Sequence, residues 1–399
     1  DNNTAITRGG AFANRSTGAT VDLTDSFIRG NTARNEHGGG FYNNGTVEMA
    51  NTVISGNTTP DLDGGVITNL NAPVNPTSTA PNTVQRDGYG AGFYNSGGTV
   101  AVTGGTINAN QSSGNGAGFT NNGGTVTANG TMIDGNSILR DPDLLNSSNY
   151  NRSGAGFSND SDGRVDLISV TLTNNVLPTD SDGNTRGVGG GFYNNGAFVN
   201  ISGSTLISGH RAEDGAGFYS DTAGSVVTIT GTDATKVQIT NNTARVRGGA
   251  FRSTGNTTVN LAHTDITGNK AETQRGGAIY ADGARIVGSN VRINNNHAGS
   301  LARNGDEQGG GLWLDGFARL ELTDSEIKGN RTEVNGGGFY AQDSVVVLTN
   351  TTVSDNLAFN SGGGGMVTGV GRIELVDSSI TSNISRDHGG GIYATNDVV

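Results

Sequence analysis

Acidic residues in two turn-like stretches are the first candidates for chemistry in this sequence. The stretches read Asp160-Ser161-Asp162-Gly163 and Asp180-Ser181-Asp182-Gly183. This spacing is typical of half of a calcium-binding loop, but neither stretch supplies all the ligands that a complete EF-hand loop needs, including a glutamate at the twelfth position. A polar turn is therefore the favoured interpretation. The alternative is a weak Ca²⁺ site, with Asp160, Asp162, Asp180 and Asp182 as ligands, and no other cofactor is indicated.

No catalytic group stands out among the other polar residues. Glycoside hydrolysis needs two carboxyl groups at a set separation, and the sequence has no aspartate dyad, although it neither shows nor excludes a pair assembled from distant segments. The histidines are His37, His210, His263, His297 and His388. His37 and His388 lie four residues before a recurring apolar residue, where Arg8, Arg247 and Arg275 also occur. We interpret this as a basic turn position rather than a general base.

Aromatic residues recur directly after an apolar residue that follows a glycine-rich segment. If the apolar residue points into the protein, strand alternation points the aromatic residue outward. An outward aromatic stripe could bind sugar rings, but a stack of rings that shields one face is the favoured interpretation. The residues are Tyr42, Tyr94, Tyr193, Tyr219, Tyr280, Trp313, Tyr340 and Tyr393.

These residues belong to a repeat whose first motif is Gly-Gly-x-apolar. The shorter intervals between successive apolar anchors cluster at 26 to 27 residues. Ile67 is the weakest member, because no alternating apolar run follows it. We expect the other anchors to stack inside the protein: Phe12, Phe41, Phe93, Phe119, Phe157, Phe192, Phe218, Phe251, Ile279, Leu312, Phe339, Met366 and Ile392.

The second motif is apolar-x-x-Asn, and it recurs once per repeat. Asparagine tolerates the positive φ of tight corners, and its amide can both donate and accept hydrogen bonds. Only Ile207-x-x-His210 breaks the rule, and we expect His210 to lie in the same column. The predicted ladder contains Asn31, Asn57, Asn110, Asn136, Asn175, Asn242, Asn269, Asn296, Asn330, Asn356 and Asn383.

The two motifs and the period predict a parallel β-helix. Between them most repeats carry two apolar residues spaced two apart, such as Val100 and Val102, which indicates a half-buried strand. One unit cannot bury its own apolar face and needs copies above and below it. We therefore expect one all-β solenoid over residues 1–399, with about 14 coils of about 26 residues and three short strands per coil.

The repeats also resemble those of known families. Ile54-Ser55-Gly56-Asn57, Gly276-Gly277-Ala278-Ile279-Tyr280 and Gly389-Gly390-Gly391-Ile392-Tyr393 carry the likeness. They are similar to the FxxN and GGA[ILV] repeats of polymorphic outer-membrane autotransporters, and more so to the GGGIYNSGTLTLTNSTISGN-type repeats of large bacterial surface and secreted proteins. The resemblance covers nearly the whole chain. It implies a right-handed β-helix and a bacterial extracellular or cell-surface location.

Longer intervals between anchors indicate insertions into the repeat. Four lie between the x-x-Asn motif and the glycine motif, at about residues 58–89, 137–153, 176–188 and 297–308. Stacked coils place that corner along one edge of the rod, so these insertions are expected to cluster there, as recognition loops or as neutral changes in length. A fifth, at about 219–238, is expected at a different corner.

Composition limits the partners. The net charge of −12 argues against nucleic acid, and no segment is long and apolar enough to span a membrane. There is no cysteine and hence no disulfide framework. The favoured function is an extracellular structural or adhesive protein, a filament subunit or an adhesin stalk, whose partner is a second copy or a cell-surface carbohydrate. A polysaccharide lyase or hydrolase, or a carbohydrate-binding β-helix, is the alternative.

The two ends of the sequence point to head-to-tail assembly as an expectation. Asp1 lies two residues before Asn3, which occupies an x-x-Asn position, and Val399 lies seven residues after the anchor Ile392. Both ends would then expose strand edges that could template another copy. The chain is expected to be a filament subunit or the ordered core of a longer surface protein.

Overall fold

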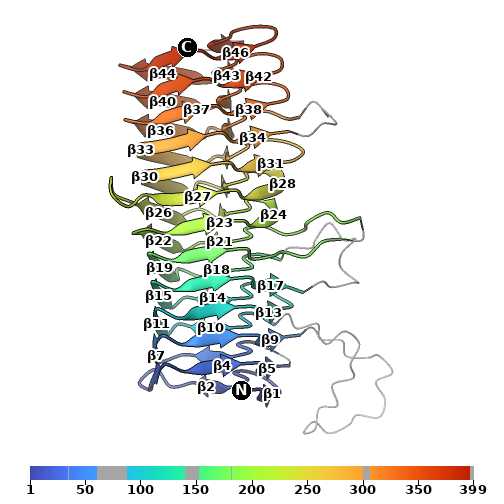
Figure 1. Ribbon diagram of the computed structural model, residues 1–399, viewed down its shortest axis with the longest axis vertical. Coiled ribbons are helices and arrows are strands. Elements are labelled where there is room, and N and C mark those ends of the chain that lie inside the picture. Colours follow the sequence, from blue (N-terminus) through green and yellow to red (C-terminus); the bar gives the residue numbers. More distant parts are fainter. Residues whose placement is uncertain (35, 61–87, 140–151, 181, 300–305, 396–399) are drawn as a thin grey trace.

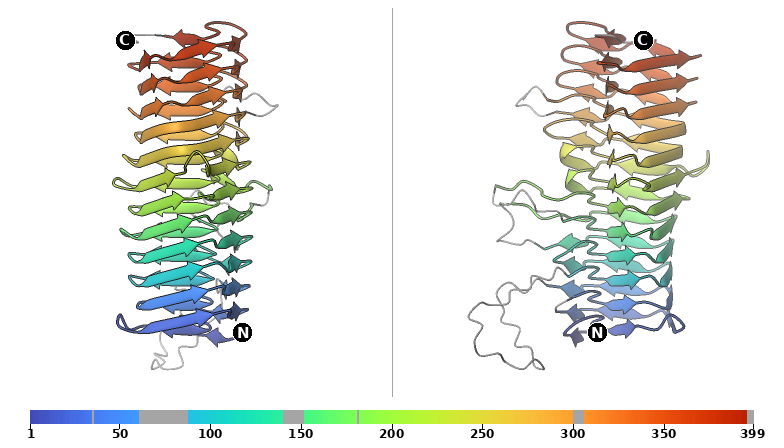
Figure 2. Two further views of the ribbon diagram at one scale, coloured as in Figure 1. Left: turned by 60° about the vertical axis from the view of Figure 1, so that its left-hand side comes forward. Right: turned by 180° about the vertical axis from the view of Figure 1, so that it is seen from behind.

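The fold is a parallel β-helix. The computed structural model describes residues 1–34, 36–60, 88–139, 152–180, 182–299 and 306–395. In these ranges every regular element is a β-strand, and the strands pair in parallel, coil upon coil, along a rod (Figure 1). Views from the side and from behind show the same continuous stack (Figure 2). The predicted all-β solenoid is confirmed.

The anchor sheet has one strand from each coil and carries the glycine-motif residues. Its strands pair in sequence order without interruption. They are β2 (Phe12–Asn14), β6 (Phe41–Asn43), β10 (Phe93–Ser96), β14 (Phe119–Asn122), β18 (Phe157–Asp160), β21 (Phe192–Asn195), β25 (Phe218–Asp221), β29 (Phe251–Thr254), β32 (Ile279–Asp282), β35 (Leu312–Asp315), β39 (Phe339–Gln342), β43 (Gly365–Thr368) and β47 (Ile392–Ala394).

The anchor sheet corrects the predicted number of coils. It has 13 strands, not 14, because β6 pairs directly with β10 and Phe41 lies opposite Phe93. No coil therefore intervenes around Ile67, which lies outside the described residues. The interval from Phe41 to Phe93 is one coil with a long insertion.

The two-arm sheet forms two further sides of the rod. Its first arm contains β3 (Thr20–Thr24), β7 (Thr46–Ala50), β11 (Thr99–Thr103), β15 (Thr125–Asn129), β19 (Arg164–Ile168), β22 (Phe198–Ser202), β26 (Val226–Thr230), β36 (Arg319–Thr323), β40 (Val345–Thr349) and β44 (Arg372–Val376). Its second arm contains β4 (Phe27–Arg29), β8 (Val53–Ser55), β12 (Thr106–Asn108), β16 (Met132–Asp134), β20 (Thr171–Thr173), β23 (Leu206–Ser208), β27 (Val237–Thr240), β37 (Glu326–Lys328), β41 (Thr352–Ser354) and β45 (Ser379–Thr381). Two long strands, β30 (Thr258–Thr267) and β33 (Arg285–Asn294), run through both arms.

A fourth strand in most coils was not predicted. It is two residues long in most coils and follows the asparagine of the x-x-Asn motif, so the coil has four strands rather than three. These short-strand sheets contain β1 (Thr4–Ala5), β5 (Thr32–Ala33), β9 (Thr58–Thr59), β13 (Gln111–Ser112) and β17 (Ser137–Ile138), then β24 (Arg211–Asp214), β28 (Thr243–Arg247), β31 (Lys270–Ala271), β34 (His297–Ala298), β38 (Arg331–Thr332), β42 (Leu357–Ala358) and β46 (Ile384–Ser385).

The phenylalanine anchors stack along the core as predicted. From Phe12 to Phe251, successive ring centroids lie 4.5 to 4.9 Å apart with interplanar angles of 10° or less. Ile279, Leu312 and Phe339 continue the column and are fully buried. The aliphatic residues of both arms pack against this column in one cluster. Identical rings above one another thus set the inner face of the anchor sheet.

Met366 is not a core anchor, contrary to the prediction. The register places Gly365 opposite Phe339 and Met366 opposite Tyr340. The sequence has four consecutive glycines before Met366, and the fourth takes the anchor position. A Cβ on Gly365 would lie 2.3 Å from the Phe339 ring, so that ring fills the space where an anchor side chain would sit.

The predicted asparagine ladder runs through the corner between the second arm and the short strands. At each step the Oδ1 of one asparagine accepts bonds from the backbone N–H and the Nδ2–H of the asparagine in the preceding coil. For Asn136 donating to Asn175 these distances are 3.0 and 2.9 Å. Asn136 Nδ2 also donates to the Ile107 carbonyl at 2.9 Å. The ladder therefore satisfies backbone groups that the corner would otherwise leave unpaired.

His210 replaces one rung of the ladder. Its Nδ1 accepts the Asn175 N–H at 3.2 Å, and its Nε2 lies 3.0 Å from the Leu172 carbonyl. The second contact requires the proton to be on Nε2, so the ring is neutral and reproduces the acceptor and donor of an asparagine. Burial lowers the pKa of His210 to about 4.

A second buried asparagine column was missed from the sequence. It occupies the third position of the anchor strands, where the amide Nδ2 of Asn121 donates to Asn159 Oδ1 at 2.8 Å and to the Gly124 carbonyl. Its members are Asn14, Asn43, Asn95, Asn121, Asn159 and Asn194. From β25 onward serine and then apolar residues take this position. The repeated Phe-x-Asn pattern could have indicated this column, but asparagine at this place is also typical of a turn.

Glycines before each anchor allow the coils to approach closely. A Cβ on Gly118 would lie 2.2 Å from the Gly156 carbonyl oxygen of the next coil. Gly116, two residues earlier, has a φ of +66°, a conformation that favours glycine. The glycine motif is therefore a requirement of coil spacing as well as of the turn.

Replacing Phe119 by alanine is expected to destabilise the rod by about 3–5 kcal/mol, because a fully buried ring is lost from a stack that continues on both sides. Urea denaturation would measure the difference. Phe317→Ala is the control, since Phe317 is 77% exposed and its removal should change stability by about 0.5 kcal/mol or less. Equal losses for both variants would contradict the core stack.

Replacing His210 by asparagine is expected to remove part of the pH dependence of stability. The pKa of His210 is about 4 in the folded state and ordinarily about 6.5 in an unfolded chain. The unfolded state therefore binds more protons, so this contribution is fully present above pH 6.5 and is lost as the pH falls towards 4. Because His37 also has a pKa lowered to about 4, the measurement is the difference in unfolding free energy between wild type and His210→Asn at pH 7 and pH 5. Relative to His210→Asn, wild type should be less stable at pH 5 than at pH 7, and a pH-independent difference would contradict the buried neutral ring.

Candidate functional site

Four of the predicted insertions begin at the same edge of the rod. Each predicted range begins with residues that complete the short-strand row: β9, β17, the bridge residue Val176 and β34. The described part of 176–188 also contains an antiparallel bridge between Thr179 and Thr185. Residues 61–87, 140–151 and 300–305 lie outside the described residues. The insertions thus begin one short strand later than predicted.

The fifth insertion lies at another corner and is shorter than predicted. Within 219–238, strand β26 is regular, and the main added segment is residues 231–236 between β26 and β27. This loop leaves the corner between the two arms and is closed by a hydrogen bond from Thr232 N–H to the Thr235 carbonyl at 2.9 Å. It therefore lies beside the outer face of the second arm, away from the other insertions.

The aromatic residues do not form an exposed stripe. Six of the eight predicted members are at most 8% exposed, and Tyr193 and Tyr393 are half-buried. Their rings stack: the centroids of Tyr280 and Trp313 lie 4.7 Å apart, and those of Tyr42 and Tyr94 lie 5.7 Å apart. The aromatic column faces away from the phenylalanine core, as alternation predicts, but residues from the glycine corner cover it. It is therefore closed to sugar rings.

Basic residues four positions before the anchor provide this cover. The arginines lie over aromatic rings of the following coil: Arg8 over Tyr42 at 5.0 Å, Arg247 over Tyr280 at 5.3 Å, and Arg275 over Trp313 at 4.6 Å. His388 stacks on Tyr393 of its own coil at 5.2 Å. His37 stacks on Tyr94 at 4.4 Å. The predicted basic turn position is thus a repeated contact with the aromatic column, a cation–π contact for the arginines and a ring stack for His37.

One arginine lies within the aromatic column itself. The register places Arg252 between Tyr219 and Tyr280, and its guanidinium lies 5.2 and 5.1 Å from their ring centroids. Asp214, which is 5% exposed, pairs with Arg252 at 2.6 Å and with Arg247 at 3.2 Å. The single carboxylate of Asp214 bridges the two arginines and links the column to β24, which gives these charges a structural role.

The two aspartate pairs proposed for Ca²⁺ lie at different corners. Asp160 accepts hydrogen bonds from Ser158 at 2.7 Å and Asn195 at 3.2 Å, and burial raises its pKa, against the effect of these bonds. Asp162 is an exposed turn residue with a φ of 59°. The hydrogen-bond donors to the Asp160 carboxylate therefore come from the protein itself.

Asp180 is also occupied by donors from its own turn. It accepts the backbone N–H groups of Asp182 and Asn184 and pairs with Arg186 at 2.8 Å. Asp182 is exposed. Among the described residues no three His, Cys, Asp or Glu side chains are grouped to hold a metal ion. The Ca²⁺ site therefore stays a prediction without a supporting contact.

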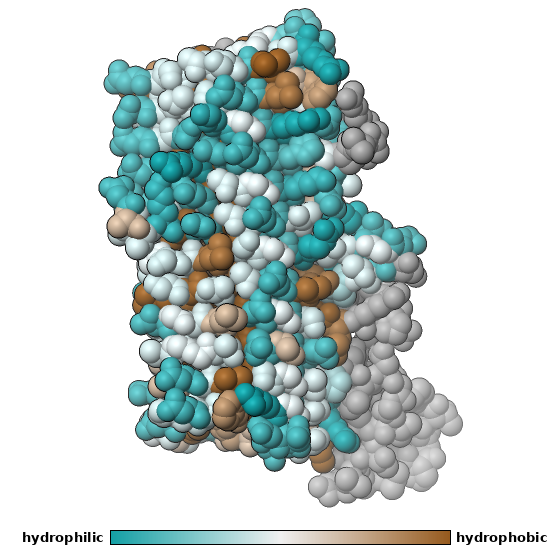
Figure 3. All heavy atoms as spheres, in the orientation of Figure 1, coloured by the Kyte–Doolittle hydropathy of each residue, from teal (hydrophilic) through white to brown (hydrophobic). Residues whose placement is uncertain are grey.

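The outer face of the second arm changes character along the rod. Its inward residue is apolar in every coil, but the preceding outward residue changes from Phe27 and Met132 in the first coils to Arg292 and Glu326 in later ones. On the face that Figure 3 shows, apolar side chains are scattered among hydrophilic ones. The charged half of this arm is the part that borders the 231–236 loop.

A groove of about 440 Å³ lies on this charged half and is the candidate functional site. It extends from the 231–236 loop across β33 and β37 to β41. Three basic and three acidic side chains line it, with polar residues between them and Val291 as the only apolar one: Asp233, Lys236, Asn290, Arg292, Asp324, Ser325, Glu326, Lys328, Thr352 and Ser354.

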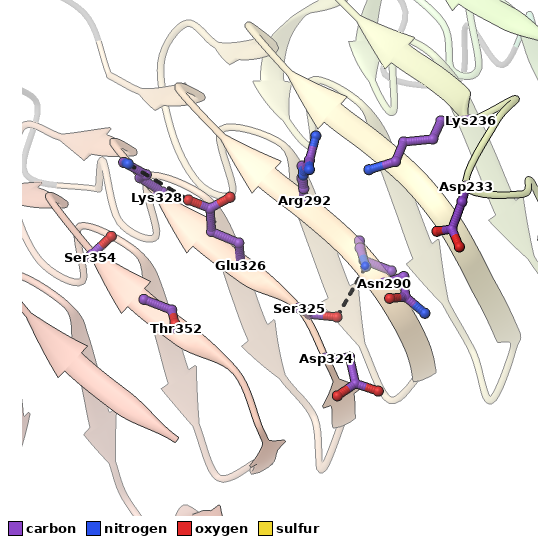
Figure 4. A pocket seen from close by; sticks show the side chains of 11 residues that line it. Asp233, Lys236, Asn290, Arg292, Asp324, Ser325, Glu326, Lys328, Thr352 and Ser354 are labelled. Carbon is purple, nitrogen blue, oxygen red and sulfur yellow. Dashed lines mark hydrogen bonds and ion pairs between the residues drawn. The ribbon is translucent and has the colours of Figure 1, made fainter. Parts of the chain in front are cut away.

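The charges are unevenly arranged within the groove. Figure 4 shows Lys236, Arg292 and Lys328 in a row along one side, with Glu326 among them, and Asp233 and Asp324 on the other side. Lys236 Nζ lies 3.5 Å from Asp265 Oδ1, and Lys328 Nζ lies 3.8 Å from Glu326 Oε1 and 3.7 Å from Asp355 Oδ2. Charged groups held this loosely at a surface contribute little to stability and are available to a ligand.

No family model, curated protein or solved structure matches this chain. Within the described residues no helix is long and apolar enough to cross a membrane. The groove is therefore interpreted from its own geometry. It was not predicted from the sequence, because its residues come from four coils and share no motif.

Trp313 is expected to be strongly protected from solvent. It is the only tryptophan, is fully buried, and lies between Tyr280 and Tyr340 under Arg275. Its fluorescence should therefore resist quenching by acrylamide, and Arg275→Ala should increase quenching by uncovering the ring. Arg372→Ala, a substitution of an exposed arginine on the first arm, is the control. Quenching of wild type as efficient as that of free tryptophan would contradict the covered column.

Proposed function

We propose that this protein is an extracellular structural or adhesive rod, a stalk or a fibre subunit of a bacterial surface, and that it is not catalytic. The observation that carries the proposal is the uninterrupted stack of equivalent residues along the described coils. Successive described coils are joined by the column of anchor residues, which is phenylalanine from Phe12 to Phe251, and by the asparagine ladder, in which His210 replaces one rung. A rod built in this way resists bending, because bending would stretch one column of contacts and compress another.

The outer faces support the same proposal. Several outward carboxylates on the first arm already pair with arginines, as Glu321 does with Arg285 at 2.6 Å and Glu374 with Arg372 at 3.1 Å. Such ion pairs are typical of a hydrated protein surface and do not activate a nucleophile. The alternative, a polysaccharide-degrading enzyme, would need an acid and a base set across a bound sugar, and the groove is the described place where one could bind.

A fibre is one form of the proposed rod. Each coil repeats the strand register of its neighbour, so the edge of one coil fits the edge of any other. Contacts between different edges build open filaments rather than closed rings. A stalk and a fibre subunit therefore share one scaffold and differ in whether copies join end to end.

Negative-stain microscopy and light scattering of purified protein are expected to show unbranched rods. Thirteen coils at about 4.8 Å each correspond to a rod on the order of 60 Å. Single rods would support the stalk, and longer filaments of the same width would support the fibre subunit. Compact or flexible particles would contradict both forms.

A parallel assay tests the catalytic alternative. Neutral and acidic polysaccharides are incubated with the protein, and new reducing ends and unsaturated sugars are measured. The expected result is no product. Product formation that is abolished by Glu326→Gln would establish the enzyme and overturn the proposal that the rod is not catalytic.

A further inference from the structure

Arg292 is the unusual residue of the groove. It is exposed on β33, between Asp265 and Glu326 in the register, yet no hydrogen bond or ion pair joins its side chain to another described residue. Figure 4 shows its side chain pointing away from that of Glu326, which lies towards Lys328. Other outward arginines, such as Arg285 and Arg319 on the first arm, pair with carboxylates. A guanidinium with five donors and no acceptor is suited to an external carboxylate.

Two further cations extend the site along the rod. Lys236 precedes β27 and Lys328 ends β37, so both border the same groove as Arg292. The groove reaches over five successive coils, roughly 19 Å at the spacing of parallel strands. This extent fits an elongated chain better than a single small anion.

The uncharged and acidic residues that line the groove indicate which groups the ligand carries besides negative charge. Asn290 has no side-chain hydrogen bond among the described residues, and Thr352, Asp324 and Glu326 supply further donors and acceptors. These groups suit the hydroxyl groups of sugars. A protein partner would need an apolar patch at the centre of its interface, and Val291 is the only apolar lining residue.

We propose that the groove binds an acidic polysaccharide of the uronic-acid type. Arg292 holds a carboxylate of the polymer, Lys236 and Lys328 hold neighbouring ones, and the polar residues on the other side bind hydroxyl groups. The proposal names the ligand of the adhesive role and rests on that role. It does not require cleavage of the polymer.

The overall charge of the protein makes this binding specific to the groove. With a net charge of −12, the protein as a whole repels a polyanion. The three acidic lining residues balance the three basic ones, so a polymer carboxylate can bind only beside the row of Lys236, Arg292 and Lys328 on one side of the groove. The acidic side of the groove favours polymers with spaced carboxylates and many hydroxyl groups over densely sulfated ones. The ligand is therefore distinguished by both its charge and its hydroxyl groups.

The test is affinity electrophoresis of the whole chain in gels containing polygalacturonate, dextran or dextran sulfate. Wild type is expected to be retarded by polygalacturonate and not by dextran. Arg292→Ala should weaken this binding about 10-fold or more, as expected for the loss of a charge-assisted hydrogen-bonded pair, and Arg292→Ala combined with Lys328→Ala should weaken it further. Because Arg292 is exposed and has no partner among the described residues, these variants should fold normally.

Arg372→Ala is the matched control, since it removes an exposed arginine from the first arm, outside the groove. It should leave binding within about twofold of wild type. No retardation by polygalacturonate, equal weakening by Arg372→Ala, or preference for dextran sulfate would overturn the assignment. Intact rods that fail to bind would refute only the ligand, whereas loss of the rod in microscopy would refute the scaffold on which it rests.

Discussion

Buried amide groups at one corner determine how each coil sits on the next. The corner carbonyls and N–H groups cannot all pair within the sheets, and an asparagine side chain supplies both the missing acceptor and the missing donor. A buried polar group left unpaired would cost about 1–3 kcal/mol, so every coil must present the same chemistry at this position. His210 meets the requirement with a neutral ring. The phenylalanine stack and the strand register follow from coils that are held at one spacing.

The architecture could be predicted from the sequence because residues that recur at one period occupy equivalent positions in successive coils. Phe119 and Asn136 each recur in neighbouring repeats, and recurrence at one period requires equivalent places in a stack. Recurrence does not give the exact register where the motif is degenerate. Four consecutive glycines before Met366 concealed which residue was the anchor, and a glycine motif at Ile67 suggested a coil that the pairing of β6 with β10 excludes.

Burial was harder to predict than orientation. Alternation correctly placed Tyr280 and Trp313 on the side of the strand opposite the core, but it could not show that Arg247 and Arg275 would lie over them. That cover depends on the path of a corner whose backbone is set by glycine. The groove was beyond prediction for a related reason, since Lys236, Arg292 and Lys328 are brought together by coil stacking and by a loop at an irregular corner.

Comparing the inward and outward residues of one strand row separates what folding requires from what function requires. On the second arm the inward column keeps Ile266, Ile293 and Ile327 in successive coils, because each must fill the same place in the core. The adjacent outward column is charged at Asp265, Arg292 and Glu326, between uncharged residues in the coils before and after them, and no core contact requires that change. An unpaired arginine opposite a glutamate gains little for stability in water. Its position beside the 231–236 loop is therefore better explained by recognition than by folding.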